Sequence, residues 1–228
     1  METLREINNA LVSLTVDEET RVVLIRGNGE RAFCAGIEVK DHLGEMLPQM
    51  MTEFGKLFKI LRGLDKPSIA LVNGIALGGG CEIIAGCDLA IAAEGVKMGQ
   101  PEIQLGGLAP AAAALFPRIM GQKKAYELIL IGNSITAEQA EKIGLVNKVV
   151  PLAELDKAGE ETAKAFLSKS ALSVKLVRDA FYQCAATPDL TDALDKATVL
   201  GIANWSTEDG QEGLKSYLEK RPAVWKNK

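Results

Sequence analysis

The 228-residue chain contains one histidine, His42, and lacks the motifs of several common catalytic sites. A Ser-His-Asp triad would have to use His42, and no G-x-S-x-G nucleophile elbow is present. A zinc-binding H-E-x-x-H helix needs two histidines and is therefore excluded. A metal enzyme would need a site made mostly of carboxylates or thiolates, and no such cluster is visible. A Walker A phosphate loop is excluded as well, because no Gly-Lys-Ser or Gly-Lys-Thr occurs.

Long apolar runs and a secretory leader are also absent from the sequence. No run reaches the roughly 18–20 residues of a membrane span, and the opening METLREINNALVSL contains acidic residues and no signal-peptide h-region. The four cysteines, Cys34, Cys81, Cys87 and Cys184, form no C-x-x-C pair. We therefore expect a cytoplasmic protein with reduced, buried thiols. A net charge of −4 argues against nucleic acid as a partner.

The order of the apolar segments predicts an α/β protein. Strand–turn–helix units fill the first part of the chain, and after Pro151 the pattern becomes almost entirely helical. We expect helices over 4–14, 45–64, 111–120 and 135–144, and strands within 22–27, 68–77, 97–101 and 145–151. A further short apolar stretch at 32–39 is interrupted by Gly36. The chain thus divides into a sheet-containing core, 1–151, and a helical region, 152–228, whose apolar faces must be buried against something.

One helix carries its own boundary signals. Thr136 can cap it, and Gln139, three residues later, completes a capping box. Gly144 is expected to end it.

The stretch GGGCEIIAGCD, Gly78–Asp88, places three glycines immediately before an apolar helical segment. The first N–H groups of a helix have no internal partner, and glycines let a ligand oxygen come close to them. This arrangement suits an oxyanion hole. A tightly packed turn is the alternative interpretation, and the glycines alone do not decide between the two.

Two carboxylates can join such a site. Glu82 falls in the first turn of the expected helix, and Glu102 lies in MGQPEIQLGG, where Pro101 and the glycines predict an exposed, rigid loop. Two convergent carboxylates can divide the acid and base roles of a reaction. Each can equally be a solvated or helix-capping glutamate. The segment Arg31–Leu43 adds a small-residue turn with a further backbone N–H and a lysine, Lys40, that can meet a phosphate or simply lie in solvent.

These segments, in this order, resemble the crotonase (enoyl-CoA hydratase/isomerase) superfamily. AFCAGIEVK resembles that family's A-F-x-[AS]-G-x-D-x-K segment. VNGIALGGGCEIIAGCDLAIA resembles its V-x-G-x-A-x-G-G-G-x-E-L-x-x-x-C-D segment, and MGQPEIQLGG its F-x-x-P-E-x-x-x-G segment. The resemblance covers nearly the whole chain. It implies a crotonase-like spiral of β-β-α units with C-terminal helices that form trimers, which often pair into hexamers.

The resemblance also implies an acyl-CoA substrate and roles for single residues. The backbone N–H groups of Ile37 and Gly79 match the oxyanion hole, and Glu82 and Glu102 match the glutamates that activate water and exchange the α-carbon proton. Ala35, Ile37 and Lys40 match positions around coenzyme A, which enters as part of the substrate, so no separate cofactor and no metal is expected.

Three departures from the family pattern stand out. The family usually has roughly 25–35 further residues at the N-terminus, so its first strands are expected to be missing here. Glu38 replaces the usual aspartate, and GLAPAAAALFPRIMG replaces a glycine-containing segment, which should reshape the acyl pocket. Together with IEVKDH, this replacement resembles the cyclohexa-1,5-dienecarbonyl-CoA hydratase branch.

Several functions remain open at this point. The leading one is a hydratase that adds water to a conjugated acyl-CoA, because both glutamates are kept, whereas many isomerases of the family keep only the second. An isomerase and a cyclic dienoyl-CoA hydratase are variants of the same chemistry. A catalytically inactive crotonase-fold binding protein, whose partner is an acyl-CoA or RNA, is the alternative of another class. No membrane partner is expected.

Overall fold

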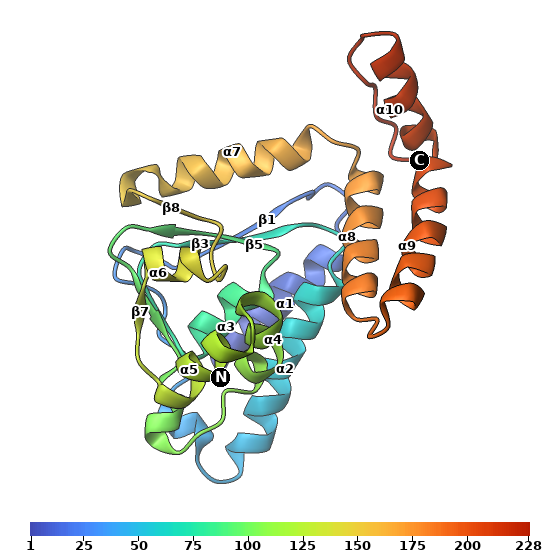
Figure 1. The fold of residues 1–228 in the computed structure, drawn as a ribbon. Coiled ribbons are helices and arrows are strands. Elements are labelled where there is room, and N and C mark those ends of the chain that lie inside the picture. Colours follow the sequence, from blue (N-terminus) through green and yellow to red (C-terminus); the bar gives the residue numbers. More distant parts are fainter. The chain divides into compact units, whose positions relative to one another are not determined.

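The structure is a computed structural model that describes residues 1–228 (Figure 1). The chain forms two compact units, one made of Met1–Leu64 and Ser68–Glu161, the other of Asp65–Pro67 and Thr162–Lys228. The functional division expected from the sequence, a core over 1–151 and an oligomerisation region over 152–228, stays a prediction.

The first unit contains two four-stranded sheets, ordered β1-β3-β5-β8 and β2-β4-β6-β7. All neighbouring strands are parallel except β6 and β7. The strands of the first sheet are β1 (Val23–Arg26), β3 (Ser68–Val72), β5 (Leu89–Ala93) and β8 (Lys148–Val150). Those of the second are β2 (Ala32–Cys34), β4 (Ile75–Leu77), β6 (Lys97–Gly99) and β7 (Ile135–Thr136). The strands from β1 to β6 thus alternate between the two sheets, and the structure has the α/β architecture expected from the sequence.

The apolar run at 68–77 contributes to both sheets. Its first half forms β3, in which all five residues are buried because β1 and β5 flank it on either side. The chain then breaks at Asn73–Gly74 and continues as β4 in the other sheet. The single interrupted strand expected from the sequence is therefore two strands, and β4 leads directly into the glycine triplet.

The first unit also contains helices and short 3₁₀ turns. They are α1 (Glu2–Val16), η1 (Val39–His42), α2 (Met46–Gly63), α3 (Gly79–Gly86), η2 (Pro101–Leu105), α4 (Pro110–Met120), α5 (Gln122–Ile131) and α6 (Ala137–Lys142), followed by η3 (Leu152–Glu154) and the start of α7 (Leu155–Leu167). The short helix α3 is central, because it contacts α2, α4 and strands of both sheets (Figure 1). The seven residues of α3 from Gly79 to Ala85 are all buried.

Two of these helices bear directly on the expectations from the sequence. The capping box of α6 is confirmed, since Thr136 Oγ1 accepts from Gln139 N and the Gln139 side chain accepts from Thr136 N. The helix α5 carries no strong capping residue and was not expected.

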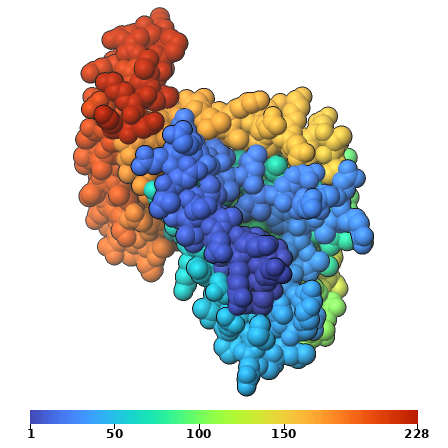
Figure 2. Space-filling model, turned by 180° about the vertical axis from the view of Figure 1, so that it is seen from behind, coloured from blue at the N-terminus to red at the C-terminus, as the bar shows by residue number.

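At the outer face of the unit, α1 packs on α2 and is exposed along the surface in Figure 2.

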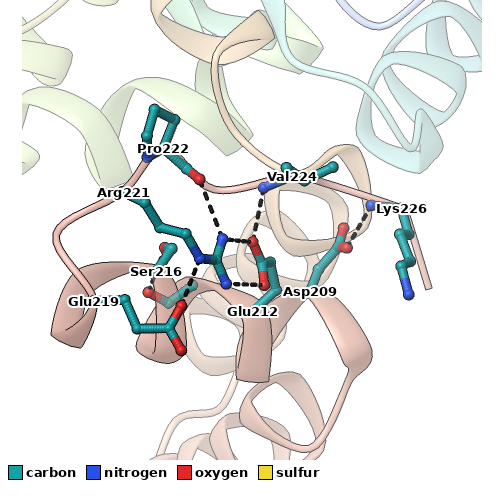
Figure 3. A network of polar contacts seen from close by, with 9 residues as sticks. Asp209, Glu212, Ser216, Glu219, Arg221, Pro222, Val224 and Lys226 are labelled. Carbon is teal, nitrogen blue, oxygen red and sulfur yellow. Dashed lines mark hydrogen bonds and ion pairs between the residues drawn. The ribbon is translucent and has the colours of Figure 1, made fainter.

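The second unit is helical, as expected after Pro151. It contains α8 (Ala171–Ala185), α9 (Leu190–Trp205) and α10 (Glu208–Leu218), which contact one another. The C-terminal tail is bound to α10 by polar contacts (Figure 3). Arg221 makes paired hydrogen bonds to Glu212, and the backbone N–H groups of Lys226 and Asn227 donate to the Asp209 carboxylate.

None of the helices combines the length and the apolar character needed to cross a bilayer. All four cysteines are free thiols, and the expectation that all are buried was wrong: Cys81 and Cys87 are buried, but Cys34 and Cys184 are partly exposed.

Candidate active site

A cavity of about 720 Å³ lies at the junction of β4 and α3. Its polar lining includes Glu82 from α3, Glu102 from η2 and His42 from η1. Its apolar wall comes mainly from α2, through Leu47, Met50, Met51 and Phe54. Segments that lie far apart in the sequence therefore form one pocket with an apolar body and few polar groups, which is typical of a small-molecule site.

Gly78, the first glycine of the triplet, is required at the N-cap of α3. Its φ of 55° lies in the region that only glycine adopts easily. A Cβ at this position would overlap a carboxylate oxygen of Glu102. The absence of a side chain thus lets the backbone turn and lets Glu102 approach the helix N-terminus.

Gly80 serves a different purpose. A Cβ there would overlap the carbonyl oxygen of Cys34, so α3 can approach β2 closely only with glycine at this position. This close approach places the turn after β2 next to the start of α3. A Cβ built on Gly79 would lie 3.7 Å from the Cα of Gly36.

The backbone N–H groups of Ile37 and Gly79 belong to these two neighbouring turns. Both residues line the cavity. Gly79 is the first residue of α3, where a helical N–H has no intrahelical acceptor. The positive end of the α3 dipole points to the same place, so the junction is suited to an oxygen that carries negative charge.

Glu82 is almost completely buried, with 2% of its surface exposed. Its Oε1 accepts a hydrogen bond of 2.7 Å from the backbone N–H of Ala112, in the first turn of α4. Burial raises the pKa of Glu82 to about 7; the charge of Glu102 acts in the same direction, and the N–H groups of Ala112 and Ala111 oppose it. A carboxyl group with this pKa exchanges protons readily near neutral pH.

Glu102 differs from the sequence expectation. It lies in the 3₁₀ helix η2, which Pro101 begins, and it is partly buried rather than exposed on a loop. Its Oε1 accepts from Gln100 Nε2 at 3.3 Å, whereas Oε2 is buried without a hydrogen-bond partner in the chain. Burial raises the pKa of Glu102, and its own backbone N–H, the charge of His42 and the Gln100 side chain lower it.

The remaining candidates from the sequence are placed as follows. Ala35 and Ile37 line the cavity, but Lys40 does not. The Lys40 ammonium is exposed on η1 and pairs with Glu38 at 2.7 Å, an interaction that raises its pKa. The alanine-rich segment that replaces the family's glycines forms α4 and the turn before it, and Ala109 and Pro110 line the cavity.

Two polar residues of the site were not identified from the sequence. Gln100 is completely buried beside Glu102; its place two residues before the glutamate is the only signal in the sequence. In the sequence His42 is distinguished only as the single histidine and as the last residue of the IEVKDH stretch. No group of three or more histidine, cysteine, aspartate or glutamate side chains is placed to hold a metal ion.

The whole chain, residues 1–228, matches the family model described as enoyl-CoA hydratase/isomerase. The chain belongs to this family, and its fold is the crotonase fold expected from the sequence.

Individual relatives agree with this assignment. A crotonyl-CoA hydratase from Syntrophomonas wolfei subsp. wolfei is 37% identical, over 97% of this chain and 86% of its own length. A short-chain-enoyl-CoA hydratase from Clostridium acetobutylicum is 36% identical, over 96% of this chain and 85% of its own. Among solved structures, an enoyl-CoA hydratase from Bacillus anthracis superposes with a TM-score of 0.91 at 34% identity, covering 99% of this chain and 88% of that one. The chain is therefore an enoyl-CoA hydratase-like enzyme.

Proposed function

We propose that the chain adds water across the α,β double bond of a short, conjugated acyl-CoA thioester. The observation that carries the proposal is the convergence of Glu82 and Glu102 on one cavity beside the N-terminus of α3. The names of the two hydratase relatives support a short linear acyl group such as crotonyl.

In the proposed mechanism the thioester oxygen accepts hydrogen bonds from the N–H groups of Ile37 and Gly79. As water adds to the β-carbon, negative charge develops on this oxygen, so donors fixed there stabilise the transition state more than the substrate. Glu82 in its ionised form takes a proton from the attacking water. Glu102 in its protonated form gives a proton to the α-carbon, and the net result is the addition of one water molecule.

The raised pKa values of both glutamates support a role for each in proton transfer. A reaction that uses one carboxyl group as base and another as acid needs both groups to change protonation near the working pH. Burial acts in this direction on Glu82 and on Glu102. We propose that no cofactor takes part besides the coenzyme A of the substrate, with Ala35, Ile37 and Lys40 near its bound position.

The test is the loss of conjugated-thioester absorbance when the purified protein is mixed with crotonyl-CoA and, separately, with cyclohexa-1,5-dienecarbonyl-CoA. Faster turnover of crotonyl-CoA supports the proposal. Faster turnover of the cyclic substrate would assign the enzyme to the cyclic branch. If neither substrate loses absorbance while the folded protein still binds acyl-CoA, hydration is the wrong reaction and a double-bond isomerisation should be assayed.

We also propose a homotrimer, or a hexamer made of two trimers. In α9 the side chains of Leu190, Leu194, Ile202 and Trp205 repeat at helical spacing and are all more than half exposed. Such a stripe is costly in water and is typical of an interface. Light scattering after size-exclusion chromatography should give three or six times the 24.4 kDa chain mass. Leu194→Glu should reduce it, whereas Lys196→Glu on the same helix should not, and a monomeric intact chain would contradict the proposal.

A further inference from the structure

The cavity of the candidate site has an exposed mouth and a buried inner end. At the inner end lie Met50, Phe54 and Glu82, none of which exposes more than 4% of its surface. The mouth is rimmed by apolar side chains of the η1 and η2 segments that are between 62% and 74% exposed: Val39, Leu43, Leu105 and Leu108. The cavity therefore leads from solvent to a largely apolar wall on α2.

This difference between the two ends fixes the direction in which an acyl-CoA can bind. In the proposed mechanism the thioester oxygen lies at the N–H groups of Ile37 and Gly79, and two arms of the substrate extend from that point. The coenzyme A arm is large and charged, and it must extend toward solvent because burying its phosphates without partners is costly. The acyl arm is apolar and extends toward the buried wall.

Phe54 lies directly beside the point where the acyl arm begins. A Cβ built on Gly79 would be 3.2 Å from Cζ of Phe54 and 3.3 Å from its Cε2. The tip of the ring thus packs against the first residue of α3, whose N–H is one of the two proposed donors. An acyl group bound at that N–H therefore meets this ring within its first few carbons.

The Phe54 ring is held in place by a second ring. Phe58, one turn later on α2, packs edge to face against it, with ring centroids 4.9 Å apart and an interplanar angle of 87°. Phe58 in turn packs on Gly86 at the other end of α3, where a Cβ would lie 2.8 Å from its Cδ1. The two rings occupy the space that side chains at two glycines of α3 would need, so neither ring can turn aside without losing this packing.

The other side chains at the inner end are more adaptable. Met50 and Met51 also line the cavity from α2. Methionine is unbranched, turns about three side-chain bonds and adjusts to irregular shapes. A phenyl ring that is packed against a helix backbone and a second ring does not adjust in this way. Phe54 is therefore the fixed part of the apolar wall.

We propose that Phe54 is a specificity-determining residue for acyl-chain length: its ring ends the acyl pocket beside Gly79 and restricts the enzyme to short enoyl-CoA esters. The proposal rests on the proposed function for the position of the thioester oxygen. A smaller or more flexible side chain opens the space in front of Phe58 and admits further methylene groups. One methylene in an apolar pocket changes discrimination by about 10- to 200-fold.

Binding of non-reactive esters tests the proposal without catalysis. Calorimetric titration compares butyryl-CoA with octanoyl-CoA on the intact chain, on Phe54→Leu and on Phe54→Met. The intact chain should bind butyryl-CoA more tightly. In Phe54→Leu the Kd for octanoyl-CoA, relative to that for butyryl-CoA, should fall by about 10-fold or more. Phe54→Met, which keeps more of the volume and decides the matter if Phe54→Leu does not fold, should change the ratio in the same direction.

Phe116→Leu is the matched control. Phe116 is also a buried phenylalanine, in α4, but it does not line the cavity. This variant should lose stability and leave the ratio of the two dissociation constants unchanged. The proposal would be overturned by an unchanged ratio in the folded Phe54 variants or by an equal change in Phe116→Leu. Binding of octanoyl-CoA to the intact chain as tightly as butyryl-CoA would overturn it as well.

Kinetics separate this proposal from the proposed function. If the intact chain hydrates crotonyl-CoA, kcat/KM for octenoyl-CoA relative to crotonyl-CoA should rise in Phe54→Leu, and an unchanged ratio would overturn this proposal alone. If the intact chain binds butyryl-CoA but does not hydrate crotonyl-CoA, the proposed function fails, and the binding ratio still decides the role of Phe54. An intact chain that binds neither ester would overturn both.

Discussion

Asp209 in the C-terminal unit and Glu82 in the cavity are buried to nearly the same extent, with 1% and 2% of their surfaces exposed. Their pKa values nevertheless move in opposite directions. Burial acts to raise both, but at Asp209 the hydrogen bonds from Ser170 Oγ and from the N–H groups of Lys226 and Asn227 outweigh it, so its pKa falls below its ordinary value.

The difference lies in the number of donors that each carboxylate receives. Both oxygens of Asp209 accept hydrogen bonds, which stabilises the ion and ties the C-terminal tail to α10 (Figure 3). The bond from Ser170 Oγ also links Asp209 to the start of α8. In the cavity, Glu102 retains an oxygen without a partner and Gln100 retains an unpaired carbonyl oxygen. Unsatisfied buried groups are uncommon in folded proteins and often mark a functional site. At similar surface exposure, the carboxylate with more donors has a lowered pKa, and the cavity carboxylates, which have fewer donors, have raised pKa values.

The largest effect that separates the two regions is expected on catalysis. Glu82→Gln and Glu102→Gln should each lower kcat for hydration by about 1,000-fold, because a positioned acid or base contributes 10²- to 10⁴-fold. The alanine variants at both positions should lose hydration as well and keep most acyl-CoA binding. Absorbance kinetics and calorimetric titration with a non-reactive acyl-CoA provide the measurements. A variant with near wild-type turnover would remove that glutamate from the mechanism.

The second effect is on the pH dependence of stability. Between its ordinary value of 4.5 and about 7, Glu82 binds more proton in the folded than in the unfolded chain. The free energy of unfolding should therefore fall with rising pH over this interval, by about 3 kcal/mol from this residue. Asp209 acts with the opposite sign, since its lowered pKa adds stability that is lost as the pH falls.

Urea unfolding of the intact chain and of Glu82→Gln at pH 5 and pH 8 tests this expectation. The intact chain should lose more stability than the variant between the two pH values. Glu30→Gln, an exposed surface substitution, serves as the control and should behave like the intact chain. Identical slopes in the intact chain and Glu82→Gln would show that the raised pKa is wrong.

The third effect concerns the glycine that lets Glu102 approach α3. Gly78→Ala should displace the Glu102 carboxylate and lower kcat by about 100-fold, the cost of a misplacement near 1 Å. Gly95→Ala is a matched control, because Gly95 also has a positive φ, 75°, but has nothing within 4 Å of a Cβ. Both variants should lose some stability from backbone strain, and only the first should lose turnover. Equal kinetics in the two variants would contradict the role assigned to Gly78.

The smallest effect is expected in the C-terminal unit. Asp209→Asn keeps the shape of the side chain, but its amide NH₂ group faces hydrogen-bond donors that the carboxylate now accepts from. The substitution should therefore lower the free energy of unfolding by about 2 kcal/mol. Chemical denaturation measures this loss. The initial hydration rate per folded chain, assayed at a concentration where the oligomer stays intact, should be unchanged. A lower rate would show that Asp209 contributes to catalysis.

Local patterns predicted most of the fold. Apolar spacing located the long helices at 2–16 and 46–63, and the Thr136–Gln139 capping box located α6, because these signals depend on neighbours within one or two turns. The break at Asn73–Gly74 was visible, but its consequence was not, since only strand pairing decides that β3 and β4 belong to different sheets. The helix α5 was missed for a related reason, as its apolar residues Ala125 and Leu128 are defined by what they pack against.

The residues of the candidate site could be predicted only in part from local sequence patterns. The glycine triplet and Glu82 adjoin in sequence, so their association needed no long-range contact. Gln100 and His42 resemble ordinary surface residues in the sequence. The contact of Gln100 with Glu102 and the place of His42 in the cavity depend on how η1 and η2 fold around it.

The sequence by itself determined the residue types that the chemistry needs, the family to which they belong and the local elements that carry them. These properties depend on short stretches whose steric and hydrogen-bonding preferences are local. Only the tertiary structure decided that Glu82 is buried against the first turn of α4, that Glu102 keeps an unpartnered oxygen, and that His42 shares their cavity. Burial and hydrogen-bond donors together set the direction of a pKa shift, and both are supplied by segments distant in the chain that pack around the charge.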